Sequence, residues 1–392
     1  MWLVPGCGDD GGGNGVGGLG TIGGGAGTTA NVYVTNAGSN DVSAYSINSS
    51  TGGLAAISGS PFADVPAPSA ITVSSNGFFA YIANSRTNKV TAFRIGTNGA
   101  LLLGATTPDT PNPASVGTTP RALAIHGLTI LYVANSGSDN VTIFSIGTAG
   151  VLTPVPPSTG NPNPVSAGGL SPVALAISSI GRFSLCGHST SNTITAFQVE
   201  SSGLLTQVPQ AGPGTNPVST NVTGPTALAM SSNGQFLYVT NGASNTVTAF
   251  RVETSGLLTL IPPVGPTPNP VPTGGTTPNG IAVEPNGTHL YIANRGGTVS
   301  AFTVGSDGLL TLAPASGAAQ NPTPTLVAGS TPVALTISQD GQFLYVANSG
   351  GTVSAYTIAS GSGTLIPVTQ LLGNPFRVGV TPSAIAVSGP TL

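Results

Sequence analysis

The chain has 392 residues, of which only 5% are charged, with a formal net charge of −3 and a mean hydropathy of +0.28. Its eight Lys and Arg residues are scattered, so they cannot form the continuous phosphate-binding stripe of a nucleic-acid-binding protein. No apolar run approaches the roughly 18 to 20 residues that cross a bilayer, so we expect no transmembrane segment. The low net charge gives little repulsion between copies and favours association.

Residues 1–30 differ in composition from everything that follows. Between Gly8 and Gly27, 12 of 20 residues are Gly, which predicts a flexible tether. The run LVPGC at residues 3–7 is similar to the end of a bacterial lipoprotein signal, which makes Cys7 a candidate lipid anchor. Two alternatives stay open: a disordered tail with an incidental Cys, or a tail that docks on a neighbouring subunit.

Residues 31–392 are built from a repeat that is clearest between Pro225 and Pro262. Asn233-Gly234 is typical of a type I′ hairpin, which needs positive φ at both central positions. One four-stranded meander exposes two apolar faces and buries neither alone, so copies must stack against one another. Apolar pattern and turn residues predict four short strands, which we call a, b, c and d: Ala227–Ser231, Phe236–Thr240, Thr246–Val252 and Leu257–Ile261.

The number of repeats follows from two recurring features, the Pro that opens strand a and the residue that ends strand b. The first strand b of the chain has no strand a before it, and the last strand a has no strand b, c or d after it. The sequence therefore predicts an all-β, seven-bladed β-propeller with four-stranded antiparallel blades, closed by pairing of the C-terminal strand with the N-terminal three. Strand a opens at Pro68, Pro120, Pro172, Pro225, Pro278, Pro332 and Pro382, and strand b ends at Asn36, Asn84, Asn135, His188, Asn241, Asn294 and Asn348.

Strands of a meander alternate in direction, so the loops from d to the next a share one face with the turns from b to c. We call this the loop-rich face and expect binding there, since long loops in compact folds often carry function. The alternative is that Asn-Pro pairs in these loops only stiffen the crossing between blades. The pairs are Asn112-Pro113, Asn161-Pro162, Asn216-Pro217, Asn269-Pro270, Asn321-Pro322 and Asn374-Pro375.

The loop-rich face also collects the candidate site residues. His188, Arg121 and Arg295 are candidates for a polar catalytic cluster near the channel mouth. The alternative is that the residue ending strand b caps the b–c turn through its side-chain oxygen, and that His188 replaces Asn structurally. The other His residues show no metal-ligand spacing, and no carboxylates pair in a motif, so the sequence predicts no metal and no cofactor. Binding candidates on this face are Arg86, Asn135, His188, Asn241, Asn294 and Asn348.

The two cysteines, Cys7 and Cys186, carry a separate hypothesis. Cys186 takes the place of Val239 in the reference repeat, so we expect a small buried hydrophobic side chain. An intermolecular disulfide between Cys7 and Cys186 is the alternative.

Three segments carry a resemblance to a known family. They read FLYVTN from Phe236, LYIAN from Leu290 and FLYVAN from Phe343, followed by TVTAF or TVSAF/Y and then GLLT. From Asn31 to Ser388 the chain resembles the YVTN-type seven-bladed propellers, which include lactonase-like relatives of 6-phosphogluconolactonase and carboxymuconate cyclase and surface-layer proteins. The resemblance implies enzymes that gather His, Arg and Glu in a central cleft, with His-rich openings before strand a. Here those openings read Pro-Ser-Ala, Pro-Val-Ala or Pro-Thr-Ala, and Arg121 is the charged group.

We therefore expect an exported, non-enzymatic propeller at the cell surface or outside the cell. It would act as a structural or binding module and self-assemble into filaments through residues 1–30, with itself, surface proteins or glycans as partners. The alternative is a lactonase-like hydrolase of a small sugar or carboxylic lactone, using His188 with Arg121 or Arg295.

Overall fold

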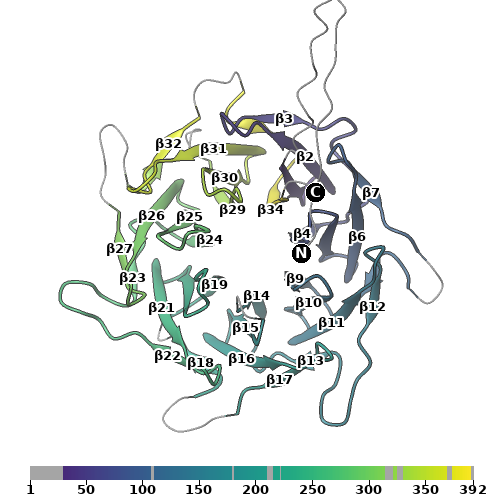
Figure 1. Cartoon of the computed structure of the whole chain (residues 1–392), viewed down its shortest axis with the longest axis horizontal. Coiled ribbons are helices and arrows are strands. Elements are labelled where there is room, and N and C mark those ends of the chain that lie inside the picture. Colours follow the sequence, from purple (N-terminus) through teal and green to yellow (C-terminus); the bar gives the residue numbers. More distant parts are fainter. Residues whose placement is uncertain are drawn as a thin grey trace, which may run out of the picture.

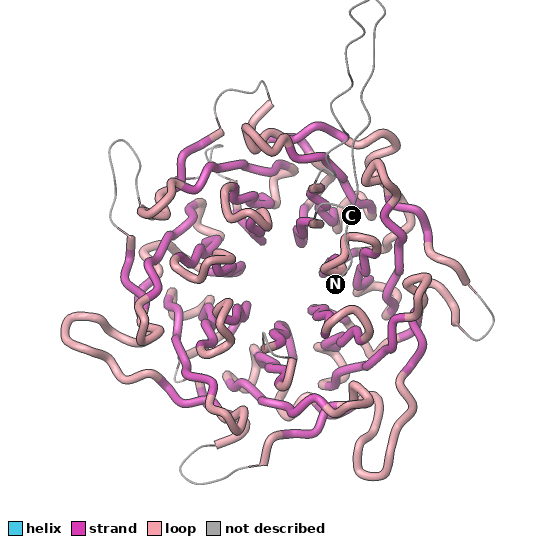
Figure 2. Tube along the Cα trace, in the orientation of Figure 1, coloured by secondary structure: helices cyan, strands magenta, loops and turns pink. Residues whose placement is uncertain are grey.

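Seven sheets, each with a main path of four strands, stand around an open centre in the computed structural model (Figure 1). The structure describes residues 30–106, 110–178, 181–209, 215–220, 222–313, 321–324, 330–368 and 373–389. Within these ranges the chain forms strands, turns and loops without a helix, as the tube in Figure 2 shows. No helix that is long and apolar enough to cross a membrane is therefore found among the described residues.

The four predicted strands of each blade are present. The innermost strands a are β4 (Pro68–Val73), β9 (Pro120–His126), β14 (Pro172–Ile177), β19 (Pro225–Met230), β24 (Pro278–Val283), β29 (Pro332–Ile337) and β34 (Pro382–Val387). Strands b are β1 (Asn31–Asn36), β5 (Phe79–Asn84), β10 (Ile130–Asn135), β15 (Phe183–His188), β20 (Phe236–Asn241), β25 (His289–Asn294) and β30 (Phe343–Asn348). Strands c are β2 (Asp41–Ile47), β6 (Lys89–Ile95), β11 (Asn140–Ile146), β16 (Thr193–Val199), β21 (Thr246–Val252), β26 (Thr298–Val304) and β31 (Thr352–Ile358). The outermost strands d are β3 (Leu54–Ala56), β7 (Leu101–Leu103), β12 (Leu152–Pro154), β17 (Leu205–Gln207), β22 (Leu258–Leu260), β27 (Leu310–Leu312) and β32 (Leu365–Pro367).

The ring closes as predicted. We number the blades from blade 1, which contains β4 to β7, to blade 7, in which β34 joins β1, β2 and β3. Strand β34 runs antiparallel to β1, with Val387 opposite Val32 and Ile385 opposite Val34. Backbone pairing between the two ends of the ring therefore leaves no unpaired edge at β1, which would otherwise be the edge strand of blade 7.

A fifth strand of two residues, which the sequence did not predict, joins most blades. It lies in the loop from d to the next a and pairs with the start of strand c, for example Val271 opposite Val247. In blade 7 a single bridge between Val42 and Phe62 takes its place. These strands are β8 (Ala114–Ser115), β13 (Val165–Ser166), β18 (Val218–Ser219), β23 (Val271–Pro272), β28 (Thr323–Pro324) and β33 (Phe376–Arg377).

The Asn-Pro pairs of these loops bind the blade internally. The Asn112 side chain accepts a hydrogen bond from the Ala92 N–H at 2.9 Å and donates to the carbonyls of Ala92 and Gly104. In blade 2 this role belongs to Asn163, next to Pro164, so the sequence assignment to Asn161-Pro162 was wrong by two residues. Two Asn-Pro pairs stand in tandem there, and only hydrogen bonding to strand c distinguishes them.

The hydrophobic core lies between neighbouring blades. One cluster joins Phe236 and Tyr238 of blade 4 to Leu290 and Phe302 of blade 5, all at most 3% exposed. A buried Tyr in strand b also bonds the next blade: the Tyr33 hydroxyl donates to the Gly99 carbonyl at 2.8 Å. Equivalent bonds join Tyr81 to Gly150, Tyr132 to Gly203, Tyr291 to Gly363, and Tyr345 to Gly52.

Candidate functional site

The innermost strands surround a central channel that opens on the loop-rich face. Its volume is about 600 Å³, and its wall is made of the first residues of the strands a and the first residues of the b–c turns. Small side chains such as Ala70, Ala174 and Ala227 keep it wide. A concave space of this size is large enough for a small-molecule site.

Two arginines bring charge to this channel. Arg121 is the second residue of β9, and Arg295 follows directly after β25. Among the described residues that line the channel there is no carboxylate and no imidazole. Guanidinium groups bind carboxylates and phosphates through paired N–H donors, and unopposed positive charge in a cleft attracts anions. The channel is therefore suited to a small anionic ligand.

Most other polar side chains at this mouth bond the neighbouring blade. Ser69 Oγ donates to the Pro120 carbonyl at 2.6 Å, and Thr226 Oγ1 donates to the Pro278 carbonyl at 2.8 Å. Ser383 Oγ donates to the Pro68 carbonyl at 2.6 Å in the same way. Arg121 stands at the equivalent position of blade 2. There it offers a ligand a guanidinium, where Ser69, Thr226 and Ser383 carry hydroxyls that bond the neighbouring blade.

The structure places His188 away from the channel. Its side chain is fully buried, and Nε2 lies 2.9 Å from Thr195 Oγ1. Burial lowers the pKa of His188 to about 4, against the opposing effects of the Asp139 carboxylate and the Ala167 carbonyl. It is Ser189, not His188, that lines the channel. His188 is therefore not brought together with Arg121 and Arg295.

The other residues ending strand b are buried in the same way. Asn84 Nδ2 donates to Thr91 Oγ1 at 2.8 Å, and Asn241 Nδ2 donates to Thr248 Oγ1 at 2.9 Å. The expectation that the side-chain oxygen caps the turn was wrong, because a hydroxyl acceptor on strand c faces the amide and takes its N–H. Asn135, Asn294 and Asn348 make equivalent bonds to Thr142, Ser300 and Ser354.

Arg86 and Cys186 also lie outside the channel wall. Arg86 is exposed on the b–c turn of blade 1 and is not part of the lining. Cys186 is a buried free thiol, and burial raises its pKa. Cys7 and the predicted tail of residues 1–30 lie, except for Ala30, outside the described residues, as does the hypothetical Cys7–Cys186 bond. Within the described ranges no three His, Cys, Asp or Glu side chains are close enough to share a metal ion.

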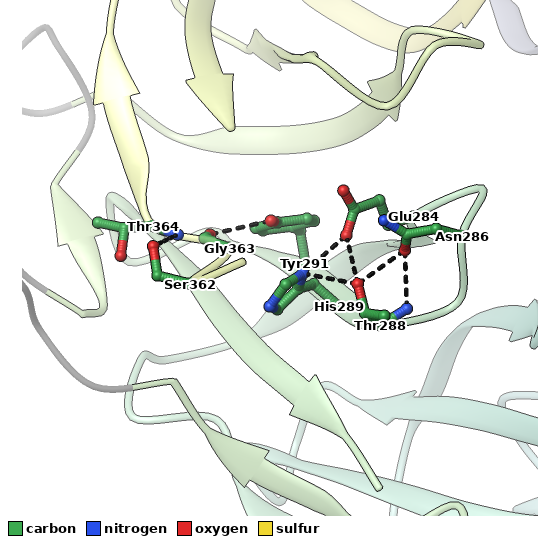
Figure 3. A network of polar contacts seen from close by, with 8 residues as sticks. All are labelled: Glu284, Asn286, Thr288, His289, Tyr291, Ser362, Gly363 and Thr364. Carbon is green, nitrogen blue, oxygen red and sulfur yellow. Dashed lines mark hydrogen bonds and ion pairs between the residues drawn. The ribbon is translucent and has the colours of Figure 1, made fainter. Parts of the chain in front are cut away.

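Sequence reasoning missed a buried pair on the opposite face. His289 Nδ1 lies 2.7 Å from Glu284 Oε2, and Thr288 Oγ1 donates to the same oxygen at 3.0 Å (Figure 3). The pair packs against blade 6, where Tyr291 donates to the Gly363 carbonyl. Ser231 and Phe236 hold these positions in the reference repeat. That both are replaced in the same blade, by a carboxylate and an imidazole, is the feature of the sequence that could have indicated the pair.

Solved structures with the same fold come from several bacteria. A candidate 6-phosphogluconolactonase from Bacteroides fragilis is 22% identical with a TM-score of 0.69, over 92% of this chain and 98% of that one. A similar protein from Bacteroides uniformis is 20% identical with a TM-score of 0.68, over 92% and 99% of the two chains. The periplasmic gluconolactonase PpgL of Pseudomonas aeruginosa is 20% identical with a TM-score of 0.67, also over 92% and 99%. At these identities the likeness shows the fold.

A family model carries the comparison further. The model described as "Lactonase, 7-bladed beta-propeller" matches residues 28–222 and 215–380. No curated protein sequence matches the chain. The family match overturns the expectation of a non-enzymatic surface module, which had relied on the Pro-Ser-Ala type openings before strand a. Export, self-assembly and the partners of the tail stay predictions.

Proposed function

Because the chain belongs to the lactonase family of seven-bladed β-propellers, we propose that it is a lactonase-like hydrolase. Its substrate would be a small sugar or carboxylic lactone bound in the central channel. The family match across both halves of the ring carries this proposal, and the channel with Arg121 and Arg295 supports it.

The proposed reaction is the opening of a cyclic ester by water. The water oxygen adds to the carbonyl carbon, the ring C–O bond breaks, and a proton from the water ends on the leaving oxygen, which becomes a hydroxyl. The product is a hydroxy carboxylate, and one proton is released to solvent. Negative charge builds on the carbonyl oxygen during addition, so donors aimed at that oxygen lower the barrier.

We assign Arg121 and Arg295 to this electrostatic role. A guanidinium is always protonated, so it can hold an oxyanion or a carboxylate but cannot accept the proton of water. The described lining offers no imidazole or carboxylate as a base. In this mechanism solvent water therefore takes the role of the base and carries the proton away from the attacking water.

The test is continuous titration of the acid released from glucono-1,5-lactone and from its 6-phosphate. Arg121→Gln and Arg295→Gln are expected to lower kcat/KM by about 10²-fold or more, as the loss of an oxyanion donor does elsewhere. Arg94→Gln is the matched control, because Arg94 is an exposed arginine on the outer strand β6 and does not line the channel. Ring opening no faster than in buffer, or equal rates in all three variants, would refute the proposal.

A further inference from the structure

A second cavity adjoins the channel at the crossing from blade 6 to blade 7. Its volume is about 610 Å³, and it lies between the b–c turn of blade 6 and the loop that leads from β33 to β34. Ser349 and Thr381 line both this groove and the central channel. The two spaces therefore form one continuous site with a side arm.

At the groove, the b–c turn of blade 6 lacks a polar side chain that bonds the next blade at five other crossings. In blades 7 and 1 to 4 the b–c turn ends in an Asn or Asp that bonds the next blade, as when Asn88 Oδ1 accepts the Thr119 N–H at 2.8 Å. In blades 5 and 6 the turn is one residue shorter, and Gly297 or Gly351 precedes strand c. A Cβ added to Gly296 of blade 5 would clash with Thr276, whereas a Cβ added to Gly350 of blade 6 would meet no described residue within 4 Å. As far as the described residues go, the space beside Gly350 is therefore open.

The mouth of the channel also lacks a side-chain hydrogen bond between blades at this crossing. Val333 holds the position at which Ser69, Thr226 and Ser383 donate to the neighbouring blade. Its side chain has no donor, so it makes no such bond to blade 7. The wall between the channel and the groove consequently lacks the polar contact made at four other crossings, as does the crossing from blade 3 to blade 4, where Val173 holds this position.

One charged side chain lines the groove. It is Arg377, the exposed second residue of β33. Among the described residues the ion pair present joins His289 to Glu284, so Arg377 is not part of it. Neither cavity has a carboxylate in its described lining. The continuous site therefore presents positive charge in both parts, from Arg121 and Arg295 in the channel and Arg377 in the groove.

We propose that the groove is a second subsite, which binds a carboxylate- or phosphate-bearing arm of a ligand whose ring lies in the channel. This inference rests on the proposed function, because it takes the ring of the ligand to be a lactone. It makes Arg377 a specificity-determining residue and Gly350 the residue that keeps the arm's path open. Lactones with an extended anionic arm become better substrates than bare rings of the same size.

The experiment uses γ-lactones that carry ω-carboxyalkyl arms of increasing length, with the methyl ester at each length as the uncharged control. KM and kcat are measured for each lactone, and calorimetry gives Kd for the ring-opened hydroxy acids. For the wild type, KM and Kd are expected to fall about two- to fivefold once the arm is long enough to reach Arg377, as for an exposed charge pair. The methyl esters should show no such fall.

Two variants with matched controls test the residues. Arg377→Gln should abolish the gain from the charged arm, and Arg94→Gln should retain it. Gly350→Trp should block long arms with at least a tenfold rise in KM and leave the bare ring unaffected. Its control is Gly147→Trp, on a c–d turn of the opposite face with room for a side chain. Far-UV circular dichroism checks that each variant is folded.

The outcomes separate the two proposals. If lactones are opened but arm length and Arg377→Gln have no effect, the groove subsite is refuted and the lactonase stands. If no lactone is opened but long hydroxy acids bind in an Arg377-dependent way, the lactonase is refuted and the subsite stands. Equal loss in Arg377→Gln and Arg94→Gln would also overturn the subsite, because it would show a general effect of surface charge.

Discussion

Replacing the buried Glu284–His289 pair by its repeat counterparts is expected to show that the pair is dispensable for stability although each half depends on the other. The two side chains are 8% and 5% exposed, with 2.7 Å between Oε2 and Nδ1. In the reference repeat, Ser231 accepts the Phe236 N–H at 2.9 Å and Phe236 fills the space against the next blade. Glu284→Ser with His289→Phe therefore restores an arrangement that this fold already contains.

The magnitudes follow from what each change leaves buried. Glu284→Ser alone leaves the imidazole without its carboxylate, which costs about 1 to 3 kcal/mol for an unpaired buried polar group. His289→Phe alone leaves a buried carboxylate and should cost about as much. The double variant should lie within about 1 kcal/mol of the wild type or above it, because replacing both partners by packed apolar groups is often neutral or stabilising.

The assay is urea unfolding followed by far-UV circular dichroism, because the sequence has a single Trp, Trp2, far from the pair in the chain. The four proteins form a double-mutant cycle, and the expected coupling energy is about 2 kcal/mol or more. A double variant as unstable as the sum of the two single variants would refute the reasoning. It would mean that the two residues act separately and not as a pair.

Two further predictions use the same assay. Tyr345→Phe should destabilise the ring by about 1 kcal/mol or more, because it removes the hydroxyl that donates to the Gly52 carbonyl, whereas Tyr238→Phe should be neutral or stabilising, because the buried Tyr238 hydroxyl has no hydrogen-bond partner among the described residues. For His188 the folded pKa of about 4 lies below the usual 6.5, so the unfolded chain binds a proton that the folded chain excludes, and stability falls as pH drops from about 6.5 to 4. This loss amounts to at most about 3 kcal/mol and should be absent in His188→Asn, compared at pH 7 and 5; an equal pH dependence in both proteins would contradict it.

Much of the fold could be predicted because the repeat states each boundary several times. Pro68 and its six counterparts do open the innermost strands, and Asn36 and its counterparts do end strands b. The two-residue fifth strand escaped prediction because two residues carry no periodicity. The role of Asn163 escaped for a similar reason, since hydrogen bonding to Ile143 depends on the path of the loop and not on the dipeptide.

The sequence predicted the face on which the candidate site residues lie, but not which of their side chains line the channel. Strand order alone assigns Arg121, Arg295, Arg86 and His188 to the loop-rich face, and only the first two line the channel. His188 ends a strand b whose side chain turns into the blade toward Thr195. Whether a side chain at a strand end points inward or toward the axis is decided by packing between blades, which a single repeat does not reveal.

The positions at which the repeat is kept and the positions at which it changes have different roles. Where Ser69, Thr226 and Ser383 recur, their hydroxyls are used between blades, so none is free to select a ligand. A ring of equivalent blades can lose such a bond at one crossing and stay closed, because the other crossings and β34 still hold it. Arg121, at a single blade, and the short turns of blades 5 and 6 are changes of this kind. In this propeller the unrepeated residues at the mouth are therefore those to test for ligand selection, and the repeated ones are those to test for stability.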